Sequence, residues 1–172
     1  MGMQYDVRSG HIEQSGYIIP YTRSRLKGLS FKGTASAGQL DVFSTNSAPV
    51  TAAYGQSGTT VTITKVGHGL QPGQKIGIAY AAGTGGTGVC GNVTIATVPT
   101  ADTFTYECIN SYTITGSPAC YYVVGGEWMA SFNCAAGDTY NNYFLLPGEG
   151  ILAEAKIYAR LNNINSVTIF YG

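Results

Sequence analysis

Residues 151–161 read ILAEAKIYARL, with an apolar side chain at every odd position. Glu154 and Lys156 stand at even positions, so polar and apolar side chains alternate with a period of two. This alternation is typical of a β-strand with one buried face. A helical stripe from Ile151 would instead collect Glu154 and Tyr158, which leaves no apolar face. We therefore predict one long, half-buried strand in an antiparallel sheet.

The same alternation, bounded by turn residues, predicts strands along most of the chain. Between Tyr21 and Lys32 the apolar positions change parity around Gly28, which indicates a β-bulge. No helical periodicity of useful length occurs. We therefore predict an all-β fold, an antiparallel β-sandwich of jelly-roll-like type. The other expected strands are 39–43, 59–65, 75–80, 92–98, 103–109, 119–123, 127–132, 140–146 and a last strand after Asn165.

The composition changes in the middle of the chain. Residues 51–124 are richer in Thr, Gly and β-branched residues and contain five of the predicted strands, enough for a small barrel or sandwich. The flanks, residues 1–50 and 125–172, supply about three and about four strands, which together make one sandwich. We therefore predict a discontinuous outer β-sandwich with a small β-domain inserted in one of its loops.

Charge is scarce. Charged residues make up 10% of the chain, with nine basic and nine acidic side chains, against roughly 25% in soluble domains. A neutral chain has no general attraction to nucleic acid or to an anionic membrane. We therefore expect neither nucleic acid nor a membrane as a partner. So low a charge density indicates a chain whose surface is largely covered by partner proteins.

The sequence contains no recognisable catalytic, cofactor-binding or metal-binding motif. His68 stands between two glycines after a predicted strand, so we expect it to shape a turn, and His11 has no ligand-type residue at motif spacing. The four cysteines form no CxxC pair. Three pairings are open, but free buried thiols fit a reducing cytosol better. The acids are scattered, so we predict that the protein is not an enzyme.

Two groups of residues are candidates for an interface. Arg23, Arg25 and Lys27 share one strand face, either as a solvated edge or as a contact to an acidic protein surface. Leu152 and Tyr158 stand among charges on the exposed side of the 151–161 segment. We expect a homo-oligomer, with a trimer favoured. Further amphipathic surface is expected from Tyr121, Tyr122, Tyr140 and Tyr143.

Several motifs of the flanks resemble a family of small tailed-phage virion structural proteins, each about one β-sandwich. They are RSRLKGLSFKG at 23–33, LPGEGIL at 146–152 and NSVTIFYG at 165–172. The middle segment is similar to a module of phage tail and capsid proteins, and in fold to the small β-domain inserted in ubiquitin-activating enzymes. Its markers are TVTIT at 60–64, HGL at 68–70, Gly73, GNVTI at 91–95 and TFT at 103–105.

These resemblances imply a component of a bacteriophage virion. The favoured expectation is a capsid decoration (cement) protein, a homotrimer on the capsid surface that binds the major capsid protein after assembly in the host cytoplasm. The resemblances also leave open a tail or neck accessory, or a receptor- or carbohydrate-binding module.

Overall fold

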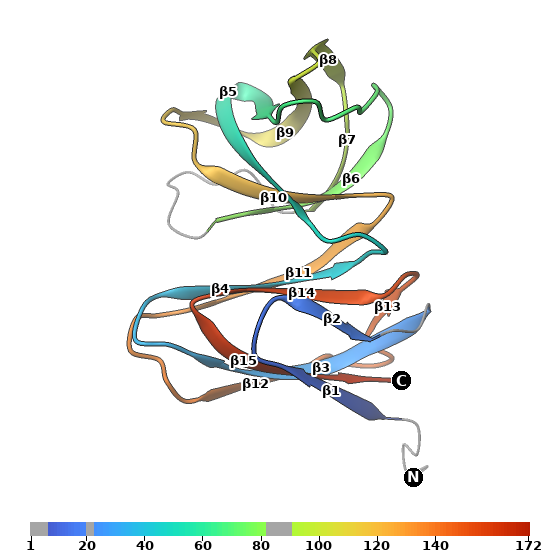
Figure 1. Ribbon diagram of the computed structural model, residues 1–172, viewed down its shortest axis with the longest axis vertical. Coiled ribbons are helices and arrows are strands. Elements are labelled where there is room, and N and C mark those ends of the chain that lie inside the picture. Colours follow the sequence, from blue (N-terminus) through green and yellow to red (C-terminus); the bar gives the residue numbers. More distant parts are fainter. Residues whose placement is uncertain (1–6, 20–22, 82–90) are drawn as a thin grey trace. The chain divides into compact units, whose positions relative to one another are not determined.

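The computed structural model describes residues 7–19, 23–81 and 91–172. Strands and their connecting turns account for this part of the chain, without any helix, so the predicted all-β class is confirmed. Consequently, none of the described segments is a helix that could cross a membrane. The chain divides into two compact units (Figure 1). The outer unit comprises Met1–Asn46 and Met129–Gly172, and the middle unit comprises Ser47–Trp128.

The outer unit is built from two antiparallel sheets. The first sheet has the order β1 (Arg8–Ile12), β15 (Ile164–Tyr171), β3 (Ser24–Gly33) and β12 (Asn141–Leu145), and β13 (Ile151–Ala153) also pairs with β3. The second sheet has the order β11 (Glu127–Cys134), β4 (Gly38–Ser44), β14 (Ile157–Asn162) and β2 (Gly16–Ile19).

Inward-facing residues of both sheets form one apolar core, as a sandwich requires. Leu26, Leu29 and Phe31 of β3 contribute to the same buried cluster as Val42 of β4 and Ile157 of β14. The parity of β3 changes where the sequence predicts it. Phe170 of β15 is paired with Gly28, but the next residue, Tyr171, is paired with Leu26. The bulge at Gly28 is therefore confirmed.

The prediction of a single strand across residues 151–161 is wrong. β13 pairs with β3 in the first sheet, whereas β14 pairs with β4 in the second sheet. The chain changes sheets between them, where Ala155 N donates to Ser44 Oγ at 3.0 Å and Thr45 N donates to Lys156 O at 2.8 Å. The alternation survives because the odd positions point into the same core from both sheets.

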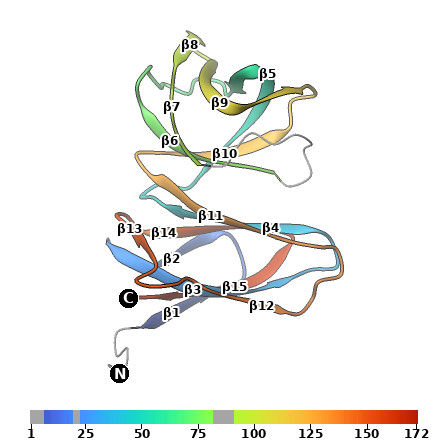
Figure 2. The ribbon, with the colours of Figure 1, turned by 180° about the vertical axis from the view of Figure 1, so that it is seen from behind.

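The middle unit is one six-stranded antiparallel sheet (Figure 2). Its strand order is β7 (Gly91–Thr94), β6 (Lys75–Tyr80), β10 (Ala119–Val124), β5 (Val50–Thr64), β9 (Thr103–Ile114) and β8 (Thr97–Thr100). The end strands β7 and β8 are not paired with each other, so the sheet does not close into a barrel. Its own buried cluster includes Tyr54, Ile63 and Phe104.

Candidate interaction surface

Three of the five candidate interface residues lie along β3 and the strand beside it. Arg25 of β3 is paired in register with Leu152 of β13, and Lys27 is two residues further along β3. Arg25 Nη2 lies 3.2 Å from Glu149 Oε2, and this carboxylate is exposed. Such a surface ion pair contributes at most about 1 kcal/mol. The structure thus brings Arg25, Lys27 and Leu152 together, with an acid beside them.

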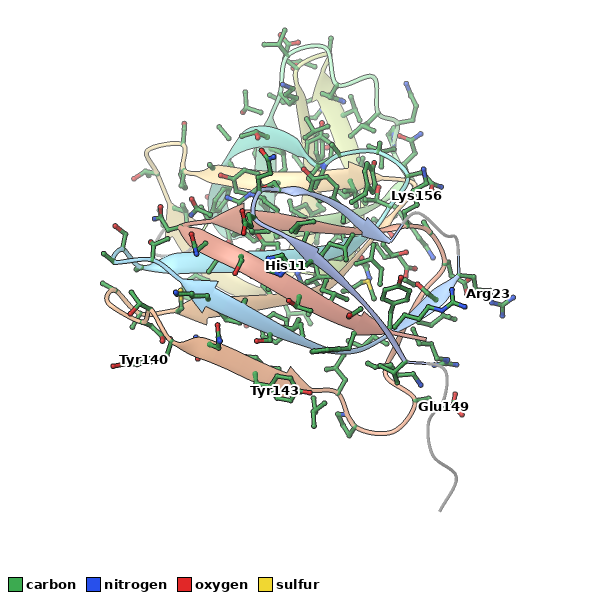
Figure 3. All side chains as sticks on the ribbon, turned by 60° about the horizontal axis from the view of Figure 1, so that its bottom comes forward. His11, Arg23, Tyr140, Tyr143, Glu149 and Lys156 are labelled. Atoms are coloured by element: carbon green, nitrogen blue, oxygen red, sulfur yellow. The ribbon has the colours of Figure 1, made fainter. Side chains whose placement is uncertain are left out.

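Arg23 lies just before β3 in a left-handed backbone conformation, with φ 59°. Its Nε is 3.9 Å from Glu154 Oε2, and both side chains are exposed. Figure 3 shows Arg23 and Glu149 toward the same end of the outer unit. Each of the two arginines therefore already has an acidic neighbour, which partly neutralises the basic group that the sequence suggests.

Tyr158 does not join this group. It lies on β14 in the second sheet, paired with Phe43 and Tyr17. Its ring centroid is 5.1 Å from that of Tyr17, and Lys156 Nζ lies 5.5 Å from the Tyr17 ring centroid. Burial and the neighbouring Tyr17 raise the pKa of Tyr158, which Arg160 partly offsets. The five candidates are therefore divided between the two sheets.

A second surface follows the strand β12, and we call residues 140–145 the β12 edge. Tyr140, Tyr143, Phe144 and Leu145 are 81%, 58%, 40% and 70% exposed. Figure 3 shows Tyr140 and Tyr143 along the margin of the outer unit. A concentration of exposed large apolar side chains in one short stretch marks a contact surface. The sequence signal for it is that residues 139–148 carry no charged side chain.

Aromatic contacts hold β12 from both faces. On the outer face the Tyr143 and Phe170 rings meet edge to face, with centroids 5.8 Å apart. On the core side Phe144 stacks on Phe31, with centroids 5.8 Å apart, and lies 4.9 Å from Phe132. Such pairs contribute about 0.5–1.5 kcal/mol beyond area burial. These contacts hold β12 in place at the margin of the first sheet.

Tyr122 of β10 was expected at the surface, but its side chain is buried.

The histidines have structural contacts. His68 Nδ1 accepts a hydrogen bond from Leu70 N at 3.0 Å, and its ring packs on Phe104, so its predicted role in a turn is confirmed. His11 Nδ1 is 2.8 Å from Thr168 Oγ1 at the surface. Within residues 7–19, 23–81 and 91–172, His, Cys, Asp and Glu form no group of three able to hold a metal ion.

Three of the four cysteines are free and buried, as expected: Cys108, Cys120 and Cys134. Cys90 lies outside the described residues. Burial raises the pKa of the Cys120 thiol to about 12. A thiol is nucleophilic only as the thiolate, so Cys120 is not suited to nucleophilic chemistry.

A buried ion pair in the second sheet has no signature in the sequence. Arg160 Nη1 donates to Asp41 Oδ2 at 2.6 Å. Asp41 Oδ1 accepts from Gln39 Nε2 at 2.7 Å and from Ser131 Oγ at 2.6 Å. Burial raises the pKa of Asp41. The contacts with Ser131, Arg160 and Gln39 lower it, but by less, so the pKa is raised overall. These contacts satisfy the carboxylate within the sheet, so we assign the group a structural role.

The middle unit contains a cavity of about 600 Å³. Its lining is mostly apolar and comes from the β7 region and from β9, including Val93, Ile95, Tyr106 and Ile109. The Tyr106 hydroxyl is buried and inaccessible to solvent, and burial raises its pKa. The mostly apolar walls of the cavity are suited to an apolar ligand.

Comparison with known proteins identifies no family. No protein-family model and no curated protein matches the chain. Among solved structures, "Phage phi92 endosialidase" is similar over 86% of this chain and 22% of its own length, with a TM-score of 0.37 and 21% sequence identity. This chain therefore spans about a fifth of that protein. A likeness at this level carries no argument about activity, and the following proposals rest on the residues themselves.

Proposed function

We propose that this protein is a non-enzymatic structural component of a phage virion, and specifically a capsid decoration protein that binds the major capsid protein. The observation that carries the proposal is the β12 edge, where Tyr140 and three large apolar side chains of β12 itself are exposed. Aromatic residues are enriched at protein interfaces, and charged residues are depleted at their centres. The low overall charge and the phage-type motifs at 23–33, 146–152 and 165–172 support the same function.

In this proposal the contact to the capsid shell is made by Arg25, Lys27 and Leu152, beside the β12 edge. The basic side chains steer the chain toward an acidic patch of the shell. Glu149 is displaced as the partner of Arg25 when a carboxylate of the shell takes its place. No covalent step is involved. A protein that binds only the assembled shell lowers the free energy of that state by mass action.

The test adds the full chain to purified expanded capsids and measures the bound copies and the temperature at which DNA is released. The double variant Arg25→Glu/Lys27→Glu is compared with Lys75→Glu, an exposed lysine of the middle unit. We expect at least about tenfold weaker binding for the double variant only, with a steep dependence on salt. Equal heat resistance with and without the protein would overturn the proposal, and so would only about a dozen bound copies, which fit a tail or neck.

A second candidate function is a receptor- or carbohydrate-binding module of a tail. It is favoured by the cavity of about 600 Å³ in the middle unit, which offers mostly apolar walls. Binding of the isolated chain to host cells or to a glycan array would support this function. It should be lost when Ala96, which lines the cavity, is replaced by Trp. No binding on either would exclude this candidate.

A further inference from the structure

The strand β12 has a strand partner on one side only in the described part of the chain. Leu146 N donates to Lys27 O at 2.9 Å, immediately after the last paired residue, Leu145. In an antiparallel pair, residues that bond across the pair alternate with residues that do not. By this alternation, the N–H and C=O groups of Asn141, Tyr143 and Leu145 point away from β3. They form a row of backbone donors and acceptors along the open edge.

Most other edge strands of the outer unit carry features by which native proteins block strand addition. β1 contains Arg8 and His11, β2 has only four residues, and β13 has only three. β11 is uncharged from Met129 on, but it exposes no large apolar side chain. β12 contains neither a charged residue nor a proline. Among the edge strands described in the outer unit, β12 is the one that combines an uncharged, proline-free stretch of five residues with exposed large apolar side chains.

We propose that the β12 edge pairs with the β12 edge of a second copy of this chain. A strand added here must be uncharged, because burying an unpaired charge is costly. It must also carry apolar side chains that extend the patch of Tyr143 and Leu145. β12 itself meets both requirements, and two copies bring no like charges together along the edge.

The geometry selects an antiparallel pair centred on Tyr143. In that register Tyr143 faces Tyr143 of the partner subunit, and Asn141 faces the partner's Leu145. All three residues with outward-pointing backbone groups then exchange hydrogen bonds with the partner, which no shifted register achieves. The contact is two-fold and closes at two copies. It joins the first sheets of both copies into one continuous sheet, and it predicts a dimer rather than the trimer expected from the sequence.

This inference rests on the proposed function only in that it assigns the β12 edge to a second copy and leaves Arg25, Lys27 and Leu152 beside it for the capsid shell. It is tested without capsids. Sedimentation equilibrium of the full chain should give about 36 kDa, twice the 18.0 kDa of one chain. Leu145→Lys places a charge on the edge and should weaken self-association at least about tenfold. Val66→Lys is the matched control because Val66 is 80% exposed on the middle unit, and it should remain dimeric. Circular dichroism checks that both variants keep their strand content.

A cysteine cross-link tests the register. Opposed residues of a hydrogen-bonded antiparallel pair have Cα atoms about 5.5 Å apart, within the range of a disulfide. Tyr143→Cys should therefore form a disulfide between copies on mild oxidation, located by peptide mapping, whereas Val66→Cys should not. A monomeric or trimeric wild type, equal weakening by Leu145→Lys and Val66→Lys, or no link at position 143 would overturn the inference. A dimer that does not bind capsids would overturn only the proposed function.

Discussion

Arg160 and Asp41 lie opposite each other on β14 and β4, with Nη1 2.6 Å from Oδ2. The Asp41 side chain is inaccessible to solvent, and that of Arg160 is 11% exposed. Two charges removed from water in this way stabilise each other mainly by compensating the cost of burial. The loss of either partner therefore leaves a buried charge without its counter-ion.

Replacing Asp41 by Ala should lower the free energy of unfolding by about 3–5 kcal/mol, because the buried Arg160 then loses the carboxylate that compensates the cost of its burial. Urea titration followed by circular dichroism measures the loss. The control is Glu149→Ala, which removes the exposed partner of Arg25 and should cost less than about 1 kcal/mol. Equal losses in the two variants would show that solvent reaches the Asp41 site in solution.

The raised pKa of Asp41 predicts how its contribution to the stability of the protein changes with pH. Burial raises its pKa above 3.8 in the folded protein, so the folded state binds this proton more tightly than the unfolded chain. Its contribution to stability is therefore fully present below pH 3.8 and is lost as the pH rises through the folded pKa. The stability difference, wild type minus Asp41→Asn, should decrease over that window in urea titrations. An increase would mean that pairing with Arg160 outweighs desolvation.

Cys120 should resist thiol reagents as long as the chain is folded. Its side chain is fully buried and its pKa is raised to about 12, so access and thiolate formation are both suppressed at neutral pH. Iodoacetamide labelling with peptide mapping should show modification of Cys120 in urea but not in buffer. Labelling in buffer at the rate found for the unfolded chain would indicate that the middle unit opens readily.

Periodicity predicts which side chains face the core, but not which sheet a segment joins. Along residues 151–161 it identified the buried positions, yet it missed the change of sheet. The break depends on the Ala155 contact with Ser44, 111 positions away in the sequence, and local alternation contains no information about that contact. The bulge at Gly28 was predictable because a bulge shifts the parity of the apolar residues themselves.

Only those parts of the candidate surface that come from residues close together in the sequence could be predicted. The basic residues of β3 could be read from one strand, but the acidic neighbours Glu149 and Glu154 come from elsewhere in the fold. The Asp41 pair with Arg160 spans 119 positions, and nothing near either residue indicates it. The β12 edge did leave a local signal, because residues 139–148 contain no charge.

The turn between β12 and β13 offers a matched pair of glycines. Gly148 and Gly150 have φ values of +65° and +77°, a region that costs other residues about 1–2 kcal/mol. A Cβ at Gly148 would meet open space, whereas one at Gly150 would collide with Leu26 O and approach Lys27 Cα at 3.3 Å.

We therefore expect Gly148→Ala to lower the free energy of unfolding by about 1–2 kcal/mol. Gly150→Ala should lower it by about 2–5 kcal/mol, because overpacking against β3 adds to the backbone strain. Urea titration measures both. Equal losses would show that the turn moves away from β3 without cost. A larger loss in Gly150→Ala would show that the turn cannot move away from β3 without cost, next to the pairing of Leu152 with Arg25.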